Sequence, residues 1–165
     1  MSSTDRYGIP GRLFGSVPED IYGLIGRVTM LSALLENRLH VLLCTLASAP
    51  QDWLAGKPSA ELIARCRGLL DRFRDEHRTA AAAFLDRAEA ALHHRHEVVH
   101  SLWPFTGGPD VRGWRDVPAR RGESAQLGKW TTLAASELPK LVTDFVSLMD
   151  DVHQVETWAQ MSPPA

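Results

Sequence analysis

Cysteine is scarce in this sequence, which limits the kinds of scaffold that can hold the fold together. Only Cys44 and Cys66 occur among the 165 residues, and no CxxC pair is present. A disulfide framework and a cysteine-based zinc site are therefore excluded. We expect both thiols to be reduced and buried within helices.

Long hydrophobic runs are also lacking. The longest nearly apolar run, residues 41–49, is too short to span a bilayer. Residues 1–10 have neither the charged start nor the apolar stretch of a signal peptide. The sequence therefore predicts a cytoplasmic protein with no membrane partner.

Charge of one sign is lacking as well. Eighteen Lys and Arg residues stand against 20 Asp and Glu residues, which gives a formal net charge of −2. No global field marks nucleic acid as a partner, so any polyanion must be bound locally. Arg outnumbers Lys by 15 to three, and Arg is the better bidentate ligand for phosphate.

What the sequence does contain is enough apolar residues for one globular domain, 44% of the chain, arranged with helical spacing. Ser16, followed three residues later by Glu19, and Ser136 are the expected N-caps of the first and last helix. The predicted helices are residues 18–48, Ser59–Phe73, Thr79–Leu102 and a last one whose apolar stripe extends from Leu138 to Trp158.

Residues 104–132, between the third and fourth helices, lose this periodicity. Glycine and proline alternate there with valine and tryptophan, which indicates a long loop or a small β-hairpin with Trp114 and Trp130 packed on the bundle. Because amphipathic helices need partners for their apolar stripes, we predict an all-α antiparallel four-helix bundle with this insertion. The bundle should span residues 18–160, between an extended arm at 1–17 and a disordered tail at 161–165.

Four of the seven histidines lie between His93 and His100, the only concentration of reactive side chains in the sequence. His96 and His100 are four residues apart, so they share one face of the third helix. Arg95 adds a permanent cation beside them. A cluster of this kind is suited to acid and base catalysis on a phosphate or to metal binding, and it is also compatible with a plain helix end, where the dipole favours cationic histidine.

Metal binding is one alternative, because residues 96–100 satisfy the HExxH pattern of zinc hydrolases. In that pattern His96 and His100 hold zinc, and Glu97 acts on a water molecule. A catalytic zinc needs a third protein ligand, and none of the downstream candidates lies in a recognisable second motif. Those candidates are Glu123, Glu137 and His153. We favour a site without a metal or another cofactor.

The second pattern is Arg95 followed five residues later by His100, near the end of a bundle helix. Here the chain resembles the HEPN family of helical-bundle proteins, many of which are metal-independent ribonucleases. The family motif is an Arg, a polar residue, here His96, and then a His four to six residues after the Arg. Residues 101–103 continue the sequence in a way that looks like family members.

The resemblance implies a toxin or defence component that cleaves single-stranded or transfer RNA through attack by the substrate's own 2′-OH. It implies that His100 acts as general base or acid and that Arg95 stabilises charge on the phosphoryl oxygens, while His96 orients the substrate or supports His100. It also implies a homodimer with paired motifs in a shared cleft, and an antitoxin protein of the nucleotidyltransferase type as a partner.

The insertion is the candidate surface for the RNA itself. Between Asp110 and Lys129 the basic residues exceed the acidic ones by two, so this segment can face a polyanion. Its candidate substrate-binding residues are Arg112, Arg115, Arg120 and Arg121. The alternative that the motif is structural, and that the chain is a non-catalytic HEPN-like binding or scaffold protein, stays open.

Overall fold

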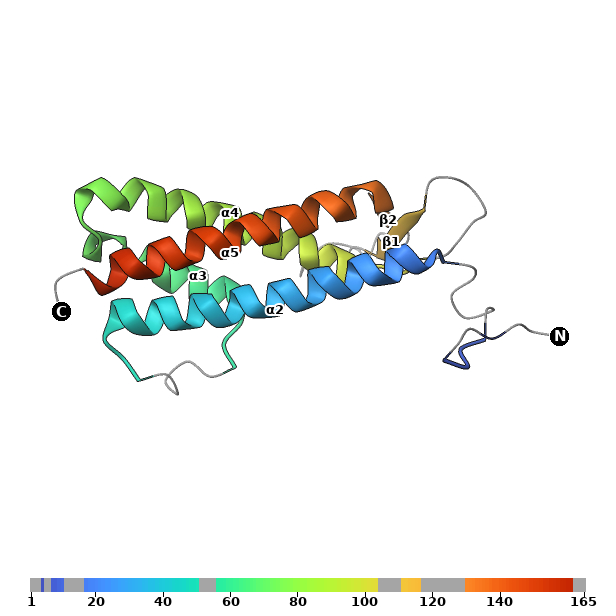
Figure 1. The fold of residues 1–165 in the computed structure, drawn as a ribbon, viewed down its shortest axis with the longest axis horizontal. Coiled ribbons are helices and arrows are strands. Elements are labelled where there is room, and N and C mark those ends of the chain that lie inside the picture. The colour runs from blue at the N-terminus through green and yellow to red at the C-terminus, as the bar shows by residue number, and fades with distance from the viewer. Residues whose placement is uncertain are drawn as a thin grey trace, which may run out of the picture.

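The computed structural model describes residues 4, 7–10, 17–50, 56–103, 111–116 and 130–161. Within these residues the chain forms a bundle of four α-helices with a two-stranded antiparallel sheet at one end (Figure 1). The predicted class, an all-α four-helix bundle with a β-hairpin insertion, is confirmed. The elements are α2 (Glu19–Ala47), α3 (Ser59–Arg67), α4 (Asp75–Val99), β1 (Arg112–Asp116), β2 (Trp130–Ala134) and α5 (Leu138–Gln160). Two short 3-10 turns, η2 (Leu70–Arg72) and η3 (Ala135–Glu137), precede α4 and α5.

The direction of α4 sets the relation between the elements. Figure 1 shows α2 and α5 running side by side in the same direction, away from the hairpin, while α4 runs back toward it. The contacts between α4 and α5 agree, because Arg87 pairs with Asp151 whereas His94, farther along α4, lies beside Glu137 at the start of α5. The C-terminal end of α4 and the hairpin therefore meet at one end of the bundle.

The core is built on α2, nine of whose residues are buried. Its apolar stripe packs mainly against α5, whose Phe145 and Leu148 are fully enclosed. Among the described helices α2 is the one long and apolar enough to cross a membrane, with a mean hydropathy of 1.3 over 18 residues, and 39% of that window is buried inside the bundle. Cys44 and Cys66 are reduced and buried, as predicted.

The N-terminal boundaries of the helices differ from the sequence prediction in detail. Pro18, not Ser16, holds the N-cap position of α2, without a side-chain hydrogen bond. Glu137, not Ser136, holds that of α5, because the chain first makes the turn η3 and Pro139 then occupies the first turn of the helix. The two predicted N-caps are therefore wrong. The structure of Ser16 itself lies outside the described residues.

The predicted second helix, Ser59–Phe73, is also wrong in its second half. It ends at Arg67 with Gly68 as the C-cap, and the chain continues as the 3-10 turn η2. Glycine weakens a helix interior because it loses the most backbone freedom on ordering. The third helix begins four residues earlier than predicted, where Asp75 and Glu76 interact favourably with the N-terminal helix dipole.

The predicted end of the third helix, Leu102, is three residues too late. α4 ends at Val99 because side chains beyond it bind its last carbonyl groups. The Ser101 hydroxyl donates to the Glu97 carbonyl at 2.6 Å, and the Trp103 indole Nε1 donates to the Val98 carbonyl at 3.1 Å. These two hydrogen bonds turn the chain away from the helix axis before Pro104 is reached.

The hairpin docks against this same turn. β1 pairs antiparallel with β2, and Gly113 in β1 is buried. A Cβ atom at Gly113 would lie 2.8 Å from the Trp103 ring and 3.0 Å from Ser101 Cβ, so the backbone of β1 touches the residues that end α4. Gly113 of β1 is thereby held against Ser101 and Trp103, which follow His100 in the chain. The side chains of Trp114 and Trp130 lie outside the described residues.

Candidate functional site

Arg95 is held by α2. Its Nε atom donates a hydrogen bond of 3.1 Å to the hydroxyl of Ser32, a residue with no exposed surface. Ser32 in turn donates to the Thr29 carbonyl at 2.9 Å, so the hydroxyl has a fixed direction. Among the described residues the two terminal Nη groups of Arg95 have no hydrogen bond or ion pair. Arg95 is therefore a half-buried cation whose hydrogen-bond partner, Ser32, is uncharged. Its Nη groups remain unpaired among the described residues.

His96 and His100 lie together on the outer face of α4, as their spacing predicts. Their ring centroids are 4.4 Å apart, with the ring planes tilted by 54°. Both residues are exposed, and at the end of the helix the His100 backbone N–H donates a hydrogen bond to the His96 carbonyl. The pair forms a solvent-exposed imidazole cluster at the end of the bundle that carries the hairpin.

A cavity of about 270 Å³ lies between α3 and α4, and both Arg95 and His96 line it. Its wall on the α3 side is formed by Ser59, Ala60 and Ile63, and on the α4 side by Glu89, Leu92, His93, Arg95 and His96. Glu89, the only acidic residue of the described lining, is paired at 2.7 Å with Arg67 on α3, which is also paired at 2.7 Å with Asp86. The cavity therefore presents the charge of Arg95 together with two imidazoles. His100 lies one turn beyond it, against the His96 ring.

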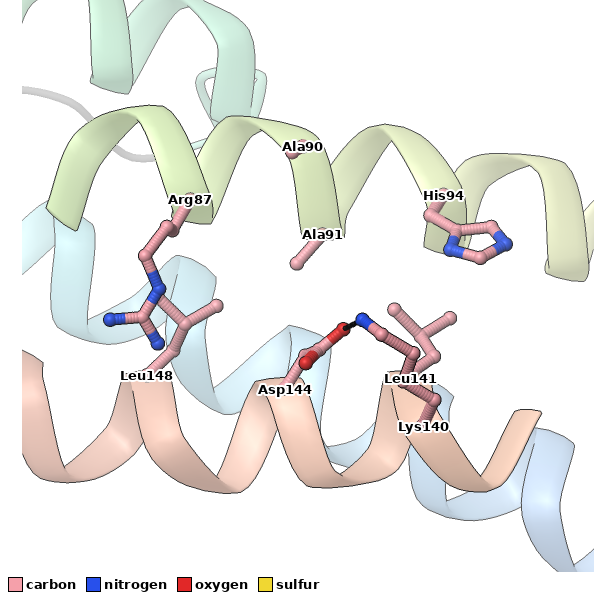
Figure 2. Close-up of a pocket in the computed structure, with 8 residues that line it drawn as sticks. All are labelled: Arg87, Ala90, Ala91, His94, Lys140, Leu141, Asp144 and Leu148. Carbon is pink, nitrogen blue, oxygen red and sulfur yellow. Dashed lines mark hydrogen bonds and ion pairs between the residues drawn. The ribbon is translucent and has the colours of Figure 1, made fainter. Parts of the chain in front are cut away.

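His94 belongs to a different surface, although it is next to His93 in the sequence. Figure 2 shows it in a second cavity, of about 390 Å³, between α4 and α5. There Lys140 is paired with Asp144 at 2.7 Å, and Arg87 with Asp151 at 2.5 Å. The charged groups of this cavity neutralise one another, unlike Arg95 in the first cavity. The four histidines therefore do not form one cluster.

The arrangement of the described side chains gives little support to the predicted zinc site. Among the described residues no group of three His, Cys, Asp or Glu side chains is placed to hold a metal ion. Glu97 lies 3.8 Å from His93, and Glu137 lies 3.5 Å from His94. His153 is on the late turns of α5, near the buried Glu156. Glu123, the remaining predicted ligand, lies outside the described residues.

The predicted substrate-binding arginines are described only in part. Arg112 is exposed at the start of β1, one residue before the contact of Gly113 with Trp103. Arg115 pairs with Thr131 in the hairpin, and its side chain lies outside the described residues, as do Arg120 and Arg121.

Comparison of the chain with protein-family models, curated proteins and solved structures finds no match.

Two residues of the site are missed by sequence reasoning. Ser32 anchors Arg95, and Ser59 lines the cavity together with His93 of the predicted histidine cluster. Ser32 did carry a signal, because it is a polar residue in the apolar stripe of α2, and a buried hydroxyl needs a partner. For Ser59 no signal exists, since only the packing of α3 on α4 brings it to the cavity.

Proposed function

We propose that the chain is a metal-independent ribonuclease, a cytoplasmic toxin or defence component, with Arg95, His96 and His100 as catalytic residues. The observation that supports this function is the half-buried Arg95 cation, which has a neutral anchor and lines the same cavity as His96. A charge removed from water is costly unless an opposite charge compensates it, so such a cation favours an anionic ligand. The resemblance of Arg95, His96 and His100 to the HEPN motif supports a phosphodiester as that ligand.

The reaction proceeds by transesterification within the RNA. The substrate 2′-oxygen forms a bond to phosphorus while the bond from phosphorus to the 5′-oxygen breaks, which leaves a 2′,3′-cyclic phosphate and a 5′-hydroxyl. One imidazole of the His96–His100 pair takes the proton from the 2′-OH, and the other, protonated, gives a proton to the departing 5′-oxygen. One Nη group of Arg95 donates to a non-bridging oxygen as its negative charge develops.

Cleavage of single-stranded and transfer RNA in buffer that contains a chelator tests this proposal. Alanine at His96 or His100 should lower kcat by about 10²- to 10⁴-fold, the usual contribution of an acid or base. Wild-type activity should follow a bell-shaped pH profile, and the products should carry cyclic phosphate ends. His94→Ala, on the other side of α4, is the matched control and should keep full activity. Full activity of both Arg95→Ala and His100→Ala would refute the assignment.

The proposal includes a homodimer formed at the end of α4. Val99 and Leu102, on either side of His100 in the sequence, are exposed apolar residues, at 38% and 67% of their surface. A second copy would cover them and bring its own Arg95 toward His100 of the first copy. This arrangement is needed because Arg95 and His100 of one chain point about 140° apart around the helix. Light scattering should show a dimer that Leu102→Asp dissociates with loss of activity. A fully active monomer at high concentration contradicts the shared site.

A second candidate function is supported by the outer face of α2. Met30, 75% exposed, and Leu34, 47% exposed, are four residues apart and form an apolar surface patch of the kind that binds other proteins. In this alternative the chain is a non-catalytic binding protein, with a nucleotidyltransferase-type protein as its partner. The absence of any RNA cleavage, together with partner binding that Met30→Glu abolishes and Arg95→Ala does not, would favour this function.

A further inference from the structure

We propose that the cavity between α3 and α4 binds a second phosphate group of the RNA, the neighbour of the phosphate that is cleaved. This inference rests on the proposed ribonuclease function and adds a substrate subsite to it. Ser59 and His93 are its new residues. Neither is needed for the chemistry at His96 and His100.

The charge of the cavity favours a phosphate. Arg95 brings a positive charge and its second Nη group, which has no hydrogen bond or ion pair among the described residues. Glu89, the acidic residue of the described lining, shares Arg67 with Asp86. His93 adds an imidazole and Ser59 a hydroxyl donor at the opposite wall. Charge-assisted hydrogen bonds from guanidinium and imidazolium groups to phosphate oxygens are about twice as strong as neutral ones.

The size of the cavity selects a phosphate group rather than a complete cofactor. Pockets that enclose drug-sized ligands have volumes of roughly 300 to 1,000 Å³. At about 270 Å³ this cavity is slightly smaller, and polar side chains stand in its wall beside Ala60, Ile63 and Leu92. It suits one phosphate with part of its sugar, entering from a strand that continues outside.

The position of the cavity relates it to the cleaved bond. His93, His96 and His100 follow one another along the same face of α4, three and then four residues apart. His93 is seven residues from His100, or about 10 Å along the helix axis. A strand whose cleaved phosphate lies at the His96–His100 pair therefore continues along α4 toward His93 and Ser59. The α4–α5 cavity is no alternative, because its cations Arg87 and Lys140 already have carboxylate partners.

Dinucleotides with and without a terminal phosphate test the subsite. Wild-type protein should cleave either pNpN or NpNp, according to strand polarity, with a KM about tenfold or more below that of NpN and a similar kcat. His93→Asn and Ser59→Ala should abolish this preference and leave kcat on NpN unchanged. His94→Asn, the matched control, should retain the preference. Equal KM values for all three substrates in the wild-type protein would overturn the inference.

A second measurement keeps the subsite testable if no RNA is cleaved and the ribonuclease proposal fails. Inorganic phosphate should shift the imidazole NMR signals of His93 and His96 in a saturable manner and leave those of His94 unchanged. Arg95→Ala should abolish the shifts. Shifts of equal size at His94, or no saturable shift at all, would refute phosphate binding in the cavity whatever the outcome with RNA.

Discussion

The contact of Gly113 with Trp103 leads to a prediction whose size can be worked from the structure. The Cβ atom introduced by Gly113→Ala would lie 2.8 Å and 2.9 Å from Cζ2 and Cε2 of the Trp103 ring and 3.0 Å from Ser101 Cβ. These distances are shorter than carbon atoms tolerate. The ring cannot move away freely, because its Nε1 donates to the Val98 carbonyl. Either β1 shifts or this hydrogen bond breaks.

The expected cost follows from the two ways of relieving the overlap. Overpacking a well-packed site typically costs about 1 to 3 kcal/mol, and a broken hydrogen bond about 1 kcal/mol. Gly113→Ala should therefore lower the free energy of unfolding by about 1 to 3 kcal/mol, or the Tm by roughly 2 to 4 °C for each kcal/mol. Urea unfolding followed by circular dichroism measures this loss, and tryptophan fluorescence reports displacement of the indole.

Gly26→Ala is the matched control. Gly26 lies within α2, and a Cβ atom there meets nothing within 4 Å, so the same substitution should stabilise the helix by up to about 1 kcal/mol. Since Gly113 is held against Ser101 and Trp103, which follow His100 in the chain, Gly113→Ala should also reduce RNA cleavage while Gly26→Ala does not. Unchanged stability and unchanged fluorescence in Gly113→Ala would refute the close contact.

Two further predictions concern titratable groups in the core. Burial raises the pKa of Glu156 in spite of its ion pair with Arg38. Because the folded state then holds the proton more tightly than the unfolded state, this contribution to stability is present at low pH and is lost as pH rises above about 4.5. Wild-type stability relative to Glu156→Gln should fall between pH 4 and pH 7 in urea titrations, and a rise would contradict the direction of the shift. Burial also raises the pKa of Cys66 to about 12, so iodoacetamide at pH 8 should alkylate it only after unfolding.

The bundle could be predicted from the sequence because its core residues are apolar and recur with helical spacing. The stripe of α5, from Leu138 through Phe145 to Val155, is buried as predicted. Helix ends were less predictable, since they depend on contacts made elsewhere. Pro104 indicated an end of α4 near Leu102, whereas the hydrogen bond from Trp103 to Val98 ends the helix earlier. Proline sets the latest residue at which a helix can end. Hydrogen bonds from side chains to the last carbonyl groups determine the residue at which this helix ends.

The candidate site was predictable only where it depends on one helix. Spacing alone places His96 and His100 on one face, and their rings are in contact. The same periodicity separates His93 from His94 by about 100°, so neighbours in the sequence line different cavities. The anchor of Arg95 is a residue 63 positions away, and only the packing of α4 on α2 reveals it.

That anchor gives a last prediction, because it couples two residues that share no sequence motif. Ser32→Ala leaves the Arg95 Nε–H half-buried without its acceptor, which should cost about 1 to 2 kcal/mol of stability. In an Arg95→Lys background, where no Nε donor reaches Ser32, the same Ser32→Ala change should cost less. The double-mutant cycle should therefore give a coupling energy of at least about 0.5 kcal/mol in urea unfolding. Additive effects would mean that Ser32 does not hold the guanidinium, and that the position of Arg95 does not depend on this contact with α2.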